Sequence, residues 1–277
     1  MDLKRLKDTP PWEWPEDAGR VFLEVILNRE LDTPERVLAA VMAGDYTVIN
    51  DDLAGTLLAV VKDDTEDDEL RSEATTSLGT ALENAFIMGF DDPDDILVSE
   101  SLYNEIRATL QTLYMSQELP KIVRRKILEG SVRSPEQWHP EAVREAYAQD
   151  DREWRLTAVF CMRFVDGFSE QILETLENED PEFRYHAVRA AEAWEVEAAW
   201  LAVRRILEAE DEDKRLLIAA MDASVTVNPN EAGTYLHAFT KSRDDDLVEA
   251  AFEAMGMIEA LTDNDRPDGD GKSVFIP

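Results

Sequence analysis

Apolar side chains recur along most of the chain with the spacing of an amphipathic α-helix. In the segments 21–26 and 53–61 they fall three or four residues apart, which places them on one helical face. Strict alternation of apolar and polar residues, the pattern of a half-buried strand, does not extend over any useful length. The pattern therefore predicts an all-α protein without a β-sheet.

The helical segments are separated by prolines that come one or two residues after an Asp, Asn or Ser, as at 32–34, 91–93, 180–181 and 228–229. An Asp or Asn just before a helix is a typical N-cap, and Pro is well tolerated in the first turn. This punctuation groups the helices into consecutive pairs. The expected pairs are 15–29 with 33–43, 47–62 with 67–88, 95–115 with 119–130, 138–149 with 151–165, 168–178 with 181–193, 196–209 with 211–224, and 229–241 with 244–261.

A short signature recurs at the second helix of these pairs: an Asp, an Arg four residues later and an Ala three residues after that. The complete copies are Asp32, Arg36 and Ala39; Asp67, Arg71 and Ala74; Asp151, Arg155 and Ala158; and Asp180, Arg184 and Ala187. Weaker copies are Asp211 with Arg215, and Asp244 with Ala251, and a seventh unit is placed around Arg124. Self-similarity at such periods is typical of a solenoid of stacked helix pairs.

Each residue of the signature has a structural role in such a solenoid. The Asp is expected to cap the second helix, which is worth about 1 kcal/mol per unit. The Arg lies one turn further on, where it can pair with that Asp or with the cap of the adjacent unit and so form a ladder. The Ala allows close helix packing. The residues assigned to this structural repeat are Asp32, Arg36, Asp67, Arg71, Asp151, Arg155, Asp180, Arg184, Asp211 and Arg215.

The segment 180–191, with Asp180, Arg184 and Ala187 in place, resembles the second helix of a HEAT repeat, and so does 67–79. The variety that it most resembles is the short HEAT-like repeat also found in bilin lyases, and the resemblance covers 15–261. It implies a right-handed α–α superhelix of about seven helix pairs. It does not imply one function, because such repeats occur in scaffolds, adaptors, chaperones and a few enzymes.

The two ends of the chain differ from the repeats. Residues 1–14 are expected to form an N-terminal cap segment in which Trp12 and Trp14, set among prolines, either cover the open end of the solenoid or form a docking site. Residues 262–277 are acidic and Gly-rich, which predicts a flexible tail. The repeat solenoid is therefore expected over 15–261.

The charge balance narrows the classes of partner. With 61 acidic and 28 basic residues, the formal net charge is −33. Such a field repels nucleic acid and anionic membranes and attracts cationic partners. The alternative is that the acidity adapts the protein to a salt-rich cytoplasm. The sequence leaves both interpretations open.

Candidate chemistry is sparse. The single cysteine, Cys161, lies in an apolar helical stretch and is expected to be buried, and one cysteine fits a reducing, cytoplasmic location. The three histidines, His139, His186 and His237, lack metal-ligand spacing. We therefore expect no catalytic residues, no metal site and no cofactor. No apolar stretch has the length of a signal peptide core or a membrane span.

Positions that should face away from the core on the second helices hold a set of cationic and aromatic side chains. They are Arg125, Lys126, Arg163, Tyr185, His186 and Arg189. One interpretation is a positive stripe that binds a partner on the inner surface. The alternative is that these arginines pair with neighbouring acids.

The expected function is therefore a non-catalytic scaffold, adaptor or assembly chaperone that binds another protein on the concave face of the solenoid. The alternative is a bilin-lyase-like enzyme or a cofactor-handling chaperone, which rests on the resemblance alone.

Overall fold

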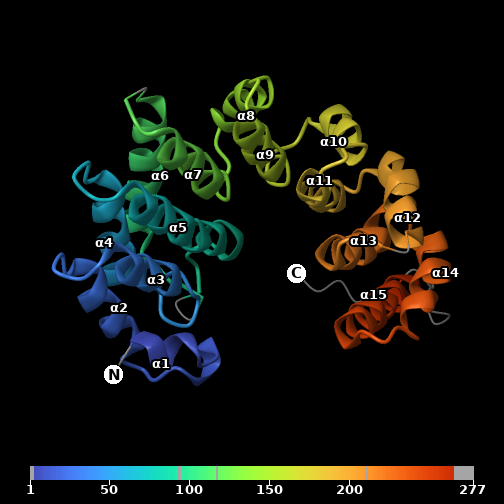
Figure 1. Ribbon diagram of the computed structural model, residues 1–277, viewed down its shortest axis with the longest axis horizontal. Helices are drawn as coiled ribbons and strands as arrows, with labels where there is room; N and C mark the ends of the chain where they lie inside the picture. Colours follow the sequence, from blue (N-terminus) through green and yellow to red (C-terminus); the bar gives the residue numbers. More distant parts are fainter. Residues whose placement is uncertain (1–2, 93–94, 117, 210, 265–277) are drawn as a thin grey trace. The chain divides into compact units, whose positions relative to one another are not determined.

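The computed structural model describes residues 3–92, 95–116, 118–209 and 211–264, and every regular element within them is helical (Figure 1). The predicted all-α class is therefore confirmed. The last helix runs to Asn264, so the first residues of the predicted 262–277 tail are helical. The rest of that tail lies outside the described residues.

The chain forms two compact units, Met1–Val165 and Asp166–Pro277, here called the N-terminal and C-terminal units. The N-terminal unit begins with α1 (Leu3–Lys7) and the short 3-10 helix η1 (Pro11–Glu13). Its helix pairs are α2 (Ala18–Leu27) with α3 (Thr33–Ala43), α4 (Asp51–Lys62) with α5 (Asp68–Met88), α6 (Glu100–Met115) with α7 (Lys121–Ser131), and α8 (His139–Tyr147) with α9 (Arg152–Cys161).

The C-terminal unit continues the same alternation. Its pairs are α10 (Ser169–Leu176) with α11 (Pro181–Ala193), α12 (Trp200–Glu208) with α13 (Lys214–Val227), and α14 (Pro229–Phe239) with α15 (Asp245–Asn264). The 3-10 helix η2 (Glu197–Ala199) leads into α12. The seven pairs match those expected from the sequence.

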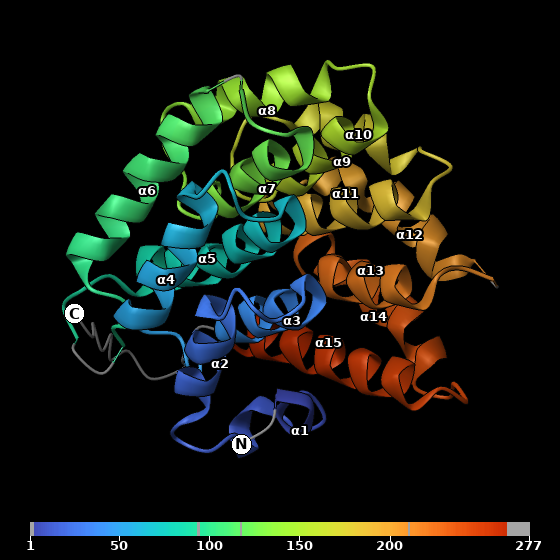
Figure 2. The ribbon, with the colours of Figure 1, turned by 60° about the vertical axis from the view of Figure 1, so that its left-hand side comes forward.

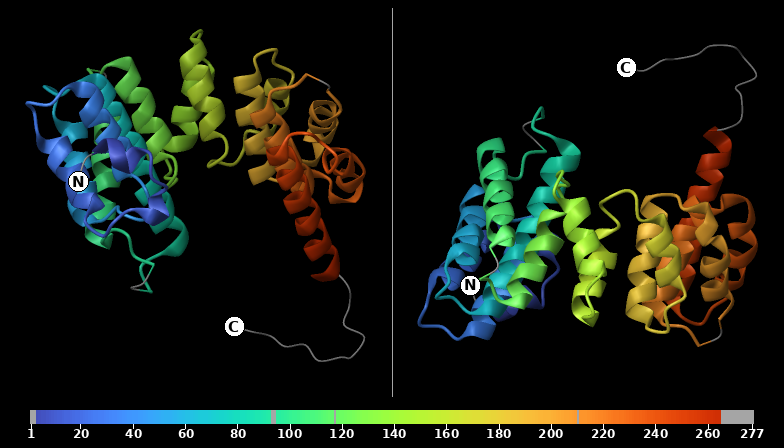
Figure 3. Two further views of the ribbon diagram at one scale, coloured as in Figure 1. Left: turned by 60° about the horizontal axis from the view of Figure 1, so that its bottom comes forward. Right: turned by 90° about the horizontal axis from the view of Figure 1, so that it is seen from above.

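Each unit consists of two layers of helices. In the N-terminal unit the second helices α3, α5, α7 and α9 pack in succession, and α2, α4 and α6 form the other layer (Figure 2). In the C-terminal unit α11, α13 and α15 pack in succession, and α12 packs on α14 (Figures 1 and 3). Successive pairs stacked in two layers are the arrangement of HEAT-like repeats, so this prediction is also confirmed within each unit.

The aspartates of the signature begin the second helices as N-caps. Asp32 Oδ1 accepts a hydrogen bond from the Glu35 amide at 3.0 Å, and Asp67 Oδ1 accepts one from the Glu69 amide at 2.8 Å. Asp151 and Asp180 cap α9 and α11 in the same way. These bonds satisfy amides at the helix start that have no partner within the helix.

The sixth pair departs from the expected register. The cap of α13 is Asp213, which accepts from the Leu216 amide at 3.1 Å, and not Asp211. The assignment of Asp211 as the cap was wrong because the helix begins two residues later. Arg215 therefore lies two residues after its cap instead of four, and Leu217 takes the position of the repeat Arg. This shift moves Arg215 to a different part of the helix surface.

Three of the arginines at the repeat position bind the end of the preceding helix. The Nε–H groups of Arg36, Arg71 and Arg124 each donate to a carbonyl ten residues earlier, at 2.9, 3.2 and 3.0 Å. The acceptors are in the last turns of α2, α4 and α6, where carbonyls lack a partner within the helix and a cation complements the helix dipole. In these three pairs the arginine thus joins the two helices, whereas Arg155 lies over the Tyr147 ring, 5.4 Å from its centroid, and its Nε has no hydrogen-bond partner among the residues that the structure describes.

Two signature arginines, Arg36 and Arg184, join successive pairs. Arg36 binds both carboxylate oxygens of Glu66, at 2.7 and 2.9 Å, and Arg184 binds both of Glu212, at 2.8 Å each. Glu66 and Glu212 directly precede the caps of α5 and α13. A ladder therefore exists at these two positions, although its acceptor is the residue before the next cap and not the cap itself.

Candidate functional site

The six side chains of the predicted stripe lie on second helices or directly after one, but in different units. Arg125 and Lys126 are on α7 and Arg163 follows α9, whereas the other three are on α11. Arg163 lies over the ring of Phe164, 5.5 Å from its centroid. The rings of Tyr185 and His186 contact each other edge to face, with centroids 5.1 Å apart.

The cationic residues on α7 do not form a free positive surface. Arg125 pairs with Glu153 at 3.0 Å and also lies 3.7 Å from Glu129, and Lys126 pairs with Glu129 at 2.7 Å. Arg125 Nε also donates to the Thr157 hydroxyl. The cations here are therefore neutralised, as the alternative of pairing with neighbouring acids predicted, by Glu129 on α7 itself and by Glu153 on α9.

A groove of about 450 Å³ lies between α11 and α13 in the C-terminal unit. It includes two of the predicted residues, Tyr185 and Arg189, which α11 contributes. The lining from α13 is Asp213, Lys214, Arg215, Ile218, Ala219 and Asp222. The Tyr185 ring, Ile218 and Ala219 supply the apolar part of the groove, and the charged side chains supply its polar part.

An ion pair joins the two helices at one part of this groove. Arg189 Nη1 lies 3.1 Å from Asp222 Oδ2 and 3.0 Å from a carboxylate oxygen of Glu192. Burial raises the pKa of the Asp222 carboxyl, and the nearby Arg189 lowers it in part. Two acids thus hold Arg189 in place. It is part of the wall of the groove as a fixed ion pair, and its charge is not free for a ligand.

Arg215 supplies the free cation of the groove. Its guanidinium carbon lies 3.7 Å from the centroid of the Tyr185 ring, which is a close cation–π contact. No described carboxylate pairs with Arg215, whereas the neighbouring Lys214 pairs with Asp244 and Asp246. The guanidinium edges therefore remain available to an acceptor. The sequence analysis missed this role because it placed Arg215 in the ladder, and the competing cap Asp213 was the signal that could have corrected it.

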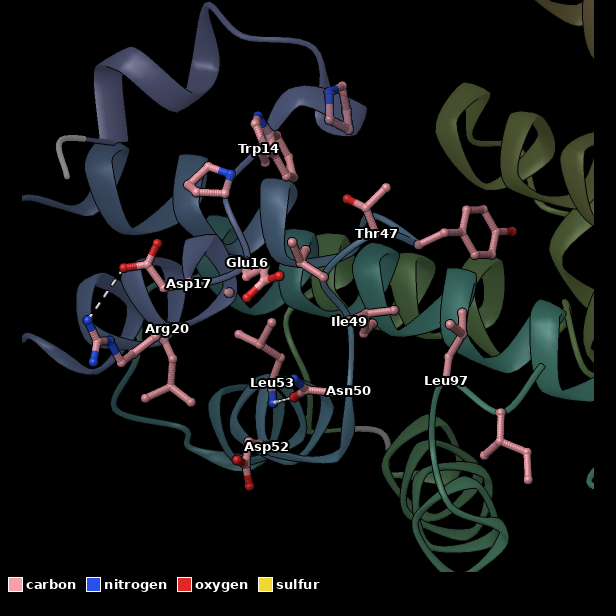
Figure 4. Close-up of a pocket in the computed structure, with 17 residues that line it drawn as sticks. Trp14, Glu16, Asp17, Arg20, Thr47, Ile49, Asn50, Asp52, Leu53 and Leu97 are labelled. Carbon is pink, nitrogen blue, oxygen red and sulfur yellow. Dashed lines mark hydrogen bonds and ion pairs between the residues drawn. The ribbon is translucent and has the colours of Figure 1, made fainter. Parts of the chain in front are cut away.

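A second cavity, of about 740 Å³, lies in the N-terminal unit beside the cap segment (Figure 4). Three separate segments line it: 11–23, 46–53 and 96–97. Trp14 lies at one side of it, and Asn50 and Leu53 at another. This cavity was not predicted, because the loop and helix residues that line it carry no recognisable motif.

Trp14 attaches the cap segment to the first helix pair. Its Nε1–H donates to the carbonyls of Leu6 and Thr9, both at 2.9 Å, and its ring packs edge-on against Phe22 at 5.1 Å between centroids. Trp12, in contrast, is 79% exposed. Trp14 is therefore held inside the N-terminal segment and against α2, whereas Trp12 lies on the surface.

Two of the residues that could carry chemistry, Cys161 and His139, are buried. Cys161 is fully buried, and burial raises the pKa of its thiol well above the ordinary value. Burial lowers the pKa of His139 to about 3, and this ring accepts from the Glu136 amide and contacts the Ser131 hydroxyl. No group of three or more potential metal ligands occurs in the described part of the chain. No helix there is long and apolar enough to span a membrane.

No protein family model matches the chain, and no curated protein matches it. Among solved structures it is similar to an engineered protein, with 12% identity and a TM-score of 0.43 over 90% of this chain and 82% of the other. It is also similar to human deoxyhypusine hydroxylase in complex with glycerol, with 15% identity and a TM-score of 0.42 over 88% and 97% of the two chains. A second engineered protein has 16% identity and a TM-score of 0.34 over 89% and 98%.

Proposed function

We propose that the protein is a non-catalytic scaffold, adaptor or assembly chaperone that binds a partner protein through its second-helix layer. The groove between α11 and α13 is the observation that supports this proposal. It combines an apolar surface on Tyr185, Ile218 and Ala219 with the unpaired guanidinium of Arg215. A protein segment with an apolar side chain next to a carboxylate or a backbone carbonyl would satisfy both parts.

The geometry favours binding over chemical turnover. The Tyr185 ring orients the Arg215 guanidinium before any partner arrives, which lowers the ordering cost of binding. A guanidinium presents several N–H donors in a fixed plane and can bind a carboxylate with two parallel hydrogen bonds. The adjacent ion pair of Arg189 and Asp222 keeps α11 and α13 in register. The groove is thus a preformed surface for recognition.

The net charge of −33 supports a protein partner in preference to nucleic acid or an anionic membrane. The single cysteine supports a cytoplasmic location. Salt adaptation of the acidic surface stays a prediction, and so does the bilin-lyase-like or cofactor-handling alternative.

Affinity capture with matched variants tests the proposal. Wild-type protein, Arg215→Glu and Ile218→Glu would each be immobilised and exposed to a lysate of the native organism, with mass spectrometry of the retained proteins. The control is Arg205→Glu, which makes the same charge change in the same unit at an exposed side chain of α12 that pairs with Glu177. Circular dichroism would verify equal helicity.

The expected result is one stoichiometric partner retained by the wild type and the control and lost from both groove variants. Retention of that partner by Arg215→Glu and Ile218→Glu would refute the groove as the binding site. Failure of the wild type to retain any partner would count against the scaffold function itself.

A further inference from the structure

The cavity beside the N-terminal cap segment has no part in the function proposed above, and it lies in the other unit. Its apolar lining includes Trp14 and the buried side chains Ile49 and Leu53 (Figure 4). Pro11 and Pro15 also line the cavity, and a proline has no backbone N–H group that would need a hydrogen-bond partner there. Its volume of about 740 Å³ is within the range of roughly 300–1,000 Å³ of known ligand pockets.

Hydrogen bonds hold both sides of the cavity wall in place. The hydrogen bonds from Trp14 Nε1 hold one side in place. Opposite it, Asn50 caps α4 by accepting from the Leu53 amide at 3.0 Å. Gly19 allows the two sides to approach, because a Cβ at this position would lie 3.2 Å from a methyl group of Leu53. The space is therefore set by the fold and does not depend on one mobile side chain.

The charge of the lining selects the ligand. Glu16, Asp17 and Asp52 contribute three carboxylates, and Arg20 is the only cation among the lining residues. Arg20 is already engaged, 3.5 Å from Asp17 and 3.8 Å from Glu24. No described cation pairs with Glu16 or Asp52, and the chain around them carries a net charge of −33. Charge complementarity therefore requires a cationic ligand.

The rim favours a peptide over a smaller ligand. Tyr46 lines the cavity and is 51% exposed. Large exposed aromatic side chains of this kind commonly supply contact area in protein interfaces. A ligand confined to the cavity would leave part of the Tyr46 ring in water, whereas a chain that continues past the cavity would cover it.

We propose that this cavity is a docking site for a basic peptide segment of a partner protein, with a Lys or Arg next to an apolar side chain. The apolar side chain would enter between Trp14, Ile49 and Leu53. The basic side chain would pair with Glu16 or Asp52 at the edge. Because this site is separate from the α11–α13 groove, it stands whether or not the groove binds a partner.

Random peptides displayed on phage and selected on the full-length protein test this proposal. The same library would be selected on a Glu16→Lys, Asp52→Lys double variant. The matched control is Glu30→Lys with Glu100→Lys, two exposed acids of the same unit that do not line the cavity. Both double variants change the net charge equally, and Glu100, like Asp52, is in the first turn of a helix.

The expected result is a consensus that combines Lys or Arg with an apolar residue. The selected peptide, measured by fluorescence anisotropy, should bind the cavity variant at least about tenfold more weakly and the control within about twofold. The absence of a consensus, a consensus without basic residues, or equal weakening by the control would each overturn the proposal.

Methyl NMR of the wild type keeps the test independent of variant folding. Addition of the selected peptide should shift the methyl signals of Ile49 and Ile96, which line the cavity, and leave that of Ile218 unchanged. A shift of Ile218 alone would assign the peptide to the groove and refute the cavity as its site.

Discussion

The ion pair between Arg36 and Glu66 allows the structural role of the repeat to be tested quantitatively. The side chain of Arg36 is 9% exposed and that of Glu66 is 7% exposed. Two of the guanidinium nitrogens bind Glu66 and Nε binds the Ile26 carbonyl. One side chain therefore connects α2 and α3 of the first pair with the residue before the cap of α5 in the second pair.

The change Glu66→Gln removes the charge and keeps the size. It leaves a buried guanidinium without a counter-charge, and breaking a buried pair in this way costs about 3–5 kcal/mol. Because the amide oxygen can still accept one of the two hydrogen bonds, we expect about 3 kcal/mol of destabilisation. The matched control is Glu177→Gln, which removes the charge from a pair whose side chains are both 58% exposed and which should cost about 0–1 kcal/mol.

Urea unfolding followed by circular dichroism measures these free energies of unfolding, and hydrogen exchange of α3 and α5 localises the effect. The difference in the free energy of unfolding between the wild type and Glu66→Gln should also depend on pH. The hydrogen bonds from Arg36 lower the pKa of Glu66 in the folded protein below its ordinary value of 4.5. The pair therefore stabilises the fold fully at a pH above 4.5, and this stabilisation is lost as the pH falls through the lower pKa of the folded protein. If Glu66→Gln costs no more than Glu177→Gln at pH 7, the buried ladder is not a main contact between the pairs.

Two further predictions concern packing and pH. Gly130→Ala should destabilise the protein by about 1–3 kcal/mol, because the new Cβ would lie 2.7 Å from the Thr75 carbonyl oxygen. Gly55→Ala has open space around the new Cβ and should stabilise α4 by up to about 1 kcal/mol. Urea unfolding of both variants would measure this contrast, and equal effects on the free energy of unfolding would contradict it. His139, with a folded pKa of about 3 against 6.5 in an unfolded chain, should make the wild type lose about 2 kcal/mol relative to His139→Asn as the pH falls from 6.5 to 5, because the unfolded chain alone takes up the proton; parallel pH profiles of the two proteins would contradict this.

Helix boundaries and caps were predictable from neighbouring residues. Asp32, Asp67, Asp151 and Asp180 each cap the helix that the sequence predicted for them. The failure at Asp211 has a local cause, since Asp213 is an equally good cap and the spacing to one Arg could not decide between them. An N-cap depends on the next two or three amides, which explains why this level of structure could be derived from the sequence.

The partners of the charged side chains could not be predicted in the same way. Glu66 lies thirty residues from Arg36, and Asp222 lies thirty-three from Arg189. In a chain with 61 acidic residues, many carboxylates compete for each arginine, and only the stacking of successive pairs brings one of them within reach. The predicted positive stripe was neutralised on α7 for this reason, and the unpaired Arg215 was overlooked.

The all-α class, the seven helix pairs and the aspartates that begin four of the second helices follow from the sequence, because periodicity and capping act over one or two turns. The tertiary structure alone decided the division into two units, the groove between α11 and α13, and the cavity beside Trp14. Each cavity is formed by segments that are distant in the chain and meet only when the helices pack. The surfaces that can bind a partner therefore depend on side-chain neighbours that no local pattern specifies.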